Sequence, residues 1–238
     1  VTGVQTCALP ISKRYEHEVK YDGQKYVLTE EKEILPDGTY RILDIKGNFV
    51  KEEKDSEGVV RKWSERAKLL EEQYPDGMIY RWNEFEVMTF EKLPNGDETH
   101  WNNQGLKTYE KFAGGETREW TDKGVLIYEK TETAEERRWN EKEILIYERT
   151  AEGRITEWSA HKNKIREILP DGSETRWFID TDKISYQKNA DGTFKEFDEL
   201  GRVIKEGTSK TAYVYRYYGD TEQVLDKRTL RGVYGTED

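Results

Sequence analysis

The sequence predicts an all-β protein, an array of about nine antiparallel β-hairpin repeats of 19–20 residues that form one long twisted, coiled sheet. Two observations carry this prediction. All seven tryptophans lie 19 residues apart, and the segments between turns are about six residues long and rich in Thr, Val, Ile, Tyr and Trp. An unbroken period in this range indicates a repeat architecture, and these residue types suit strands. The tryptophans are Trp63, Trp82, Trp101, Trp120, Trp139, Trp158 and Trp177.

Residues 1–12 are predicted to be a non-native segment. The stretch from Val1 to Ile11 shares neither composition nor period with the rest and resembles a translated sequencing adaptor. The alternative is a genuine N-terminal segment. On the adaptor interpretation the only cysteine, Cys7, is not native, and the chain is a fragment of a larger bacterial protein whose own N-terminus is missing.

Residues 13–30 are predicted to form a degenerate first unit, because Asp22-Gly23 stands 15 residues before Asp37-Gly38. The regular array is predicted over residues 31–210. Residues 211–238 are rich in tyrosine and leave the register, so they are either a C-terminal cap or a truncated continuation.

The seven tryptophans, together with Leu43 and Phe197 about one period before and after them, mark what we call the ladder positions. A turn glycine stands five residues before each ladder position, with Ala134 replacing it once. Asp or Asn commonly precedes the glycine, and proline comes before four of these pairs. Proline presets φ, Asp and Asn bond their own backbone, and glycine takes the positive φ, so each site is predicted to be a tight turn. The glycines are Gly38, Gly58, Gly77, Gly96, Gly115, Gly153, Gly172 and Gly192.

A second glycine recurs four residues after the ladder position, at Gly47, Gly105, Gly124 and Gly201. It suits a three-residue hairpin loop whose last residue is left-handed, which makes each repeat one β-hairpin. With this loop, Trp120 is predicted opposite Leu126 and Arg118 opposite Tyr128. Trp and Tyr would then share one aromatic face, which we expect the ribbon to wrap inward where it can.

Composition bears on several function classes. The net charge of -10, with no basic cluster, argues against nucleic-acid binding, and no apolar run approaches the length of a membrane-spanning helix. The three histidines lack metal-ligand spacing, and no phosphate loop or nucleophile motif occurs. We therefore expect no enzyme activity, no cofactor, no metal site and no membrane insertion.

The segment from Phe197 to Val203 (FDELGRV), preceded by Asp191-Gly192, resembles the YD repeat of Rhs-type bacterial proteins. Trp82-Asn83, Trp101-Asn102 and Trp139-Asn140 stand where Tyr-Asp would be. The resemblance covers roughly residues 31–210 and implies a hairpin array without catalysis, in a protein at the cell surface or secreted.

The same skeleton is also similar to the variant MORN repeats of bacterial antitoxin-like proteins, with Trp120, Gly124, Leu126 and Glu129 matching that pattern. The period is shorter than in those repeats. This resemblance implies a cytoplasmic antitoxin that acts by protein–protein contact.

The sequence therefore predicts a non-enzymatic structural scaffold or protein-interaction domain, with a glycan- or peptide-binding module as the alternative. Open edge strands are compatible with end-to-end self-association. Partners would be protein or carbohydrate, and the aromatic ladder is either a binding surface or the part that the sheet buries. The candidate binding residues are Trp82, Trp101, Trp120, Trp139, Trp158, Tyr109, Tyr128 and Tyr147.

Overall fold

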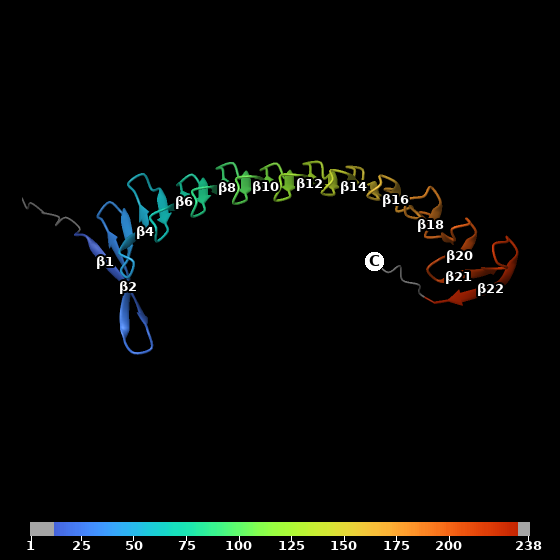
Figure 1. Ribbon diagram of the computed structural model, residues 1–238, viewed down its shortest axis with the longest axis horizontal. Helices are drawn as coiled ribbons and strands as arrows, with labels where there is room; N and C mark the ends of the chain where they lie inside the picture. The colour runs from blue at the N-terminus through green and yellow to red at the C-terminus, as the bar shows by residue number, and fades with distance from the viewer. Residues whose placement is uncertain (1–11, 233–238) are drawn as a thin grey trace, which may run out of the picture. The chain divides into compact units, whose positions relative to one another are not determined.

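The computed structural model describes residues 12–232, so the predictions for residues 1–11 and 233–238 lie outside the described chain. Within that range there are 22 strands and no helix, and all the strands are assigned to a single antiparallel sheet (Figure 1). The predicted fold class, an all-β array of hairpins, is confirmed. The chain divides into two units, which we describe separately.

Unit 1 comprises the described residues up to Ala113 together with Asp122–Gly124. Each of its strands pairs antiparallel with the next one in sequence, so the sheet order follows the chain. The strands are β1 (Arg14–Tyr21), β2 (Tyr26–Ile34), β3 (Tyr40–Asp44), β4 (Phe49–Lys54), β5 (Val60–Trp63), β6 (Leu69–Gln73), β7 (Ile79–Trp82), β8 (Met88–Lys92), β9 (Glu98–Trp101) and β10 (Lys107–Lys111).

Unit 2 comprises Gly114–Thr121 and the described residues from Val125 onward, with the same sequential antiparallel pairing. Its strands are β11 (Thr117–Trp120), β12 (Leu126–Lys130), β13 (Glu136–Trp139), β14 (Leu145–Arg149), β15 (Ile155–Trp158), β16 (Lys164–Ile168), β17 (Glu174–Trp177), β18 (Ile184–Lys188), β19 (Phe194–Phe197), β20 (Val203–Gly207), β21 (Thr211–Tyr217) and β22 (Val224–Arg231).

The predicted first turn is confirmed. All eight turn glycines have φ between 82° and 97°, and Ala134 takes the same left-handed region at 63°. In one example the Gly153 amide donates to the Thr150 carbonyl, and the Thr150 amide donates to the Arg154 carbonyl, each at 2.9 Å. These two bonds close a three-residue loop that ends on the left-handed residue.

The second turn has the same form in most repeats. Gly105, Gly124 and Gly201 have positive φ, and non-glycine residues adopt it in the same slot at Ala67, Glu86, Glu143 and Lys162. The prediction for Gly47 is wrong. Asp44 pairs with Phe49 across a four-residue loop, and Asn48 takes the positive φ of 52° instead.

The predicted common aromatic face is also wrong. Trp120 pairs with Leu126 as expected, but the pairing register of the two strands then shifts by one residue. Glu119 rather than Arg118 therefore lies opposite Tyr128. Ile127 is the extra residue of a β-bulge, and a one-residue shift moves the side chains beyond it to the other face. The same shift occurs beside every tryptophan, at the same place in each hairpin.

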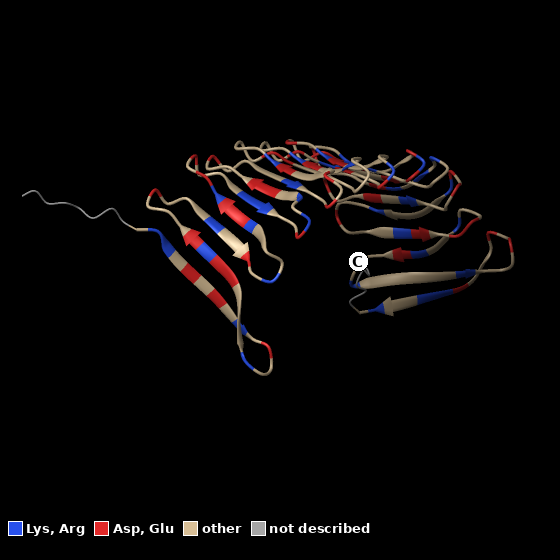
Figure 2. Cartoon of the chain, turned by 60° about the vertical axis from the view of Figure 1, so that its left-hand side comes forward, with Lys and Arg blue, Asp and Glu red and all other residues tan. Residues whose placement is uncertain are grey.

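The sheet is a single layer, and no second layer covers either face in the described residues. The only buried apolar residues there are Val59 and Ala212, with 3% and 0% exposure. No aromatic side chain is fully buried in the described residues. The expectation that the ribbon wraps an aromatic face inward is therefore wrong for both units. The reason is that both faces carry charged residues, as at the successive positions Arg137 and Arg138 of β13, and Lys, Arg, Asp and Glu recur along the strands of both units (Figure 2).

The first and last hairpins differ from the repeats between them. β1 and β2 are eight and nine residues long, and β21 and β22 are seven and eight, whereas the strands from β5 to β20 have four or five. All eight residues of β1 are exposed, because only one neighbouring strand flanks it within the described chain.

The left-handed turn residue gives a paired prediction. Gly153 has open space around its Cα, so Gly153→Ala costs only backbone strain and should lower the free energy of unfolding by about 1–2 kcal/mol. Ala134→Gly at the equivalent turn should raise it by up to about 1 kcal/mol. Urea unfolding followed by circular dichroism measures both, and equal signs for the two substitutions would contradict the strain argument.

Candidate binding surfaces

In each unit the tryptophans lie on one face, which we call the Trp face: Trp63, Trp82 and Trp101 in unit 1, and Trp120, Trp139, Trp158 and Trp177 in unit 2. Every one of these tryptophans is half-buried. Each tryptophan ends a strand and pairs across the hairpin with Leu, Met, Ile or the stem of a lysine. The Lys164 side chain pairs with Trp158, and its Nζ lies 5.5 Å from the centroid of the next ring, Trp177, so these two tryptophan positions are linked by a cation–π contact.

A polar residue directly after most tryptophans holds the following loop. The Asn140 Oδ1 accepts the backbone N–H groups of Lys142 (2.9 Å) and Ile144 (3.1 Å). Asn83 and Asn102 make the same pair of bonds, and Ser64 makes them through its hydroxyl. Sequence reasoning missed this role. The signal for it, Asn, Ser or Thr before a three-residue loop, was present as an Asx or ST turn pattern.

A row of ion pairs runs across the Trp face beside the rings. In unit 2 the Arg118 Nε lies 3.0 Å from Glu129 and the Arg137 Nε 3.0 Å from Glu148, and Arg137 also approaches Glu129 at 3.8 Å. In unit 1 the Arg61 Nε lies 2.8 Å from Glu72. These pairs are partly exposed, so each contributes on the order of 0.2–1 kcal/mol and leaves charge available to a partner.

The opposite face of unit 2, the Tyr face, carries Tyr128 and Tyr147 on either side of Arg138. The Arg138 guanidinium carbon lies 5.8 Å and 4.9 Å from the two ring centroids. Burial raises the pKa of both tyrosines above the ordinary value. The arrangement is a cation–π row, in which each ring is covered mainly by its cross-strand neighbour.

The Tyr face of unit 1 has a comparable row. The Arg81 guanidinium carbon lies 4.6 Å from the Phe90 centroid, Phe90 meets His100 edge-on at 4.9 Å, and His100 meets Tyr109 at 5.2 Å. His100 is thus half-buried between two rings.

The eight predicted site residues therefore fall into two sets. Trp82 and Trp101 lie on the Trp face of unit 1, and Trp120, Trp139 and Trp158 lie on the Trp face of unit 2. Tyr109, Tyr128 and Tyr147 lie on the Tyr faces. One ligand lying on a single face of a unit would meet only one of these sets.

Two well-covered carboxylates, Glu174 and Glu71, are each paired with two cations. The side chain of Glu174 is only 10% exposed, and Arg166 and Arg176 lie 2.8 Å and 2.6 Å from its Oε1. Burial raises the pKa of Glu174, but the hydrogen bonds and charges of the two arginines outweigh burial and hold it below the ordinary value. Glu71 is held low in the same way, against burial, by Lys62 and Arg81.

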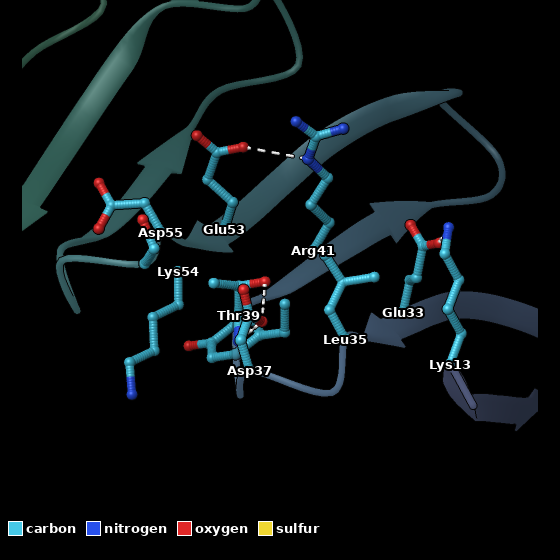
Figure 3. Close-up of a pocket in the computed structure, with 11 residues that line it drawn as sticks. Lys13, Glu33, Leu35, Asp37, Thr39, Arg41, Glu53, Lys54 and Asp55 are labelled. Carbon is cyan, nitrogen blue, oxygen red and sulfur yellow. Dashed lines mark hydrogen bonds and ion pairs between the residues drawn. The ribbon is translucent and has the colours of Figure 1, made fainter. Parts of the chain in front are cut away.

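A shallow hollow of about 400 Å³ lies beside the turns of unit 1 (Figure 3). Its charged lining is largely paired within itself, with Lys13 Nζ 2.6 Å from Glu33 and Arg41 Nε 3.3 Å from Glu53. Asp37 accepts the Thr39 hydroxyl at 2.8 Å. The hollow presents no convergent set of unpaired polar groups of the kind that orients a small ligand.

Within residues 12–232, no group of three His, Cys, Asp or Glu side chains is placed to hold a metal ion. No helix in that range is long and apolar enough to span a membrane.

No protein-family model matches the chain, and no curated protein matches it. Among solved structures it is similar to the TCP10 domain of Danio rerio CPAP in complex with a peptide of Danio rerio STIL, with TM-score 0.34 and 15% identity over 82% of this chain and 99% of that chain. It is also similar to the Photorhabdus luminescens Tc holotoxin pore, with TM-score 0.17 and 12% identity over 91% of this chain and 14% of that chain. These likenesses carry no argument about function.

The half-buried tryptophans predict an intermediate fluorescence signal. We expect an emission maximum between those of enclosed and fully hydrated indole, with acrylamide quenching all seven residues to a similar degree, because the rungs are equivalent. A blue-shifted, poorly quenched signal would contradict the single-layer arrangement.

The turn aspartates predict loss of stability in acid. A backbone N–H of Thr39 lowers the pKa of Asp37, and the hydroxyls of Ser173 and Thr193 lower those of Asp171 and Asp191. Folded pKa values below the unfolded value of about 3.9 stabilise the fold above that pH and lose this effect as pH falls through the folded values.

Asn95 holds the same turn without a titrating group, through a 3.0 Å bond from the Asp97 amide to its Oδ1. A variant with Asp37→Asn, Asp171→Asn and Asp191→Asn should therefore lose less stability than the natural chain below about pH 4. Urea midpoints at neutral and acid pH measure the difference, and parallel losses in the two proteins would contradict the assignment.

Proposed function

We propose that this chain is a non-enzymatic scaffold that binds protein segments on its Trp face. Three features support the proposal: a single-layer sheet, partly exposed tryptophans at regular spacing, and a parallel row of arginines and glutamates. Aromatic and arginine side chains dominate protein interfaces, because they combine large contact areas with directed bonds. The resemblance to YD repeats is in accord with a scaffold role.

The electrostatics favour a non-enzymatic role. A general acid or base works best with a pKa near the working pH, which for a carboxyl group means a raised value. Two well-covered carboxyls, Glu71 and Glu174, have their pKa values shifted the other way by paired cations. They act as structural ion pairs between strands.

A glycan-binding module is the second candidate, and the partial exposure of the tryptophans is the observation in its favour. Sugar rings stack on exposed indole faces, and an evenly spaced row would bind a repeating glycan at several sites. The MORN-like alternative, a cytoplasmic antitoxin, predicts a separate toxin gene beside the full-length gene. The Rhs-like role predicts a toxin domain encoded in frame downstream.

Peptide and glycan arrays probed with the whole chain test the proposal. We expect binding to peptides, and Arg137→Glu should weaken it roughly tenfold, because it reverses a charge on the Trp face between Glu129 and Glu148. Arg138→Glu is the matched control. It changes the neighbouring residue on the same strand, whose side chain lies on the Tyr face.

Equal losses in the two variants would contradict a binding site on the Trp face. Binding to glycans alone, with a change in tryptophan emission, would favour the second candidate. A chain that binds neither array would contradict both.

A further inference from the structure

We infer that β22 of one molecule pairs with β1 of a second copy in one defined antiparallel register. Within the described residues, β1 pairs only with β2 and β22 only with β21. β1 is wholly exposed and β22 is mostly exposed. The inference concerns the edges of the sheet and is independent of the Trp face.

The two strands at the edges, β1 and β22, are free of bulges over the residues that would pair with each other. The bulge between β1 and β2 is on β2, where Thr29 is the extra residue, so β1 itself is unbroken. The bulge in the last hairpin is at Leu225, which leaves Asp226–Arg231 as six regular residues. A β1 strand placed after β22 would continue the sequential antiparallel order of the array.

Hydrogen-bond alternation decides which residues face outward. The Asp22 amide bonds the Lys25 carbonyl, and the Gly232 amide bonds the Lys210 carbonyl. Asp22 and Gly232 thus direct their amides toward the neighbouring strand of the same molecule, and along each strand every second residue, starting from the one before them, directs its amide outward. The outward residues are Tyr15, His17 and Val19 on β1 and Lys227, Thr229 and Arg231 on β22.

Pairing these outward amides brings the charged residues between them face to face. With Thr229 opposite His17, Arg228 lies opposite Glu18 and Asp226 opposite Lys20. Both pairs occupy positions that are not hydrogen-bonded, where side chains are closest. Each strand already carries its own pair on that face, Lys20–Glu18 at 3.4 Å and Arg228–Asp226 at 2.7 Å. Together they form a square of four alternating charges.

Other registers lack this complementarity. Sliding the copy by two residues one way keeps one attractive pair, Arg228 with Glu16, but places Asp226 opposite Glu18. Sliding it the other way places Arg228 opposite Lys20 and Asp226 opposite Asp22. Like charges directly opposite one another are destabilising. In the proposed register Arg231 also lies opposite Tyr15, which is half exposed and open to a cation–π contact. Charge therefore selects one register among those that satisfy the amides.

Sedimentation equilibrium of the whole chain at low salt, from low to high micromolar concentration, tests the inference. We expect the average mass to rise with concentration and to fall when salt is added. The contact joins two different edges, so association should continue past a dimer or close into a ring. Glu18→Arg and Arg228→Glu should each weaken association roughly tenfold, and the double variant should restore it.

Glu16→Arg is the matched control. It makes the same charge change on the same strand, but Leu230 lies opposite, so association should hardly change. A chain that stays monomeric throughout would overturn the inference, as would a double variant without recovery. An effect of Arg228→Glu without one of Glu18→Arg would also overturn it, because that result indicates β22 pairing with itself. None of these results bears on peptide binding by the Trp face.

Discussion

The constraint on which the rest of the structure depends is that one layer of strands has no second layer to cover it. An isolated sheet of this kind buries little apolar surface, and Val59 and Ala212 are the only apolar residues that are buried in the described part of the chain. Stabilisation must then come from contacts within the layer, from backbone bonds between strands and from side chains that cover their cross-strand neighbours. This explains the high content of charged residues, because a long side chain can shield a ring with its stem and pair its head with the next strand.

Rows of side chains across the strands are therefore the structural units of each face. On the Tyr face of unit 2, Arg138 covers Tyr147, and in unit 1 Arg81 covers Phe90. On the Trp face, ion pairs run parallel to the ladder of half-buried rings. The same contacts that hold strands together are the ones presented to solvent. A binding surface therefore needs no additional element in this fold.

Much of this architecture could be predicted from the sequence. The 19-residue spacing of tryptophans and the turn glycines before them locate each hairpin, and the pairing of Trp120 with Leu126 follows from the loop length. The side on which Tyr128 lies could not be predicted, because the bulge at Ile127 is one unpaired residue that leaves no mark in the pattern of residue types. The shift of the left-handed residue from Gly47 to Asn48 could not be predicted either, since Asn adopts that conformation more readily than other non-glycine residues.

The four-residue loops have a consequence for how such a chain could change over generations. The loop between Asp44 and Phe49 has four residues, one more than most loops of the array, and so does the loop between Phe178 and Lys183. The strands that follow these loops nevertheless keep their partners. Length variation is absorbed at the margin of the sheet and is not passed to the next hairpin. If one whole 19-residue repeat were lost or duplicated, the chain would be rejoined at equivalent positions of two repeats. Every remaining hairpin would then still pair with a neighbour of the same kind. The number of hairpins in the chain can therefore evolve one repeat at a time, with no compensating change elsewhere.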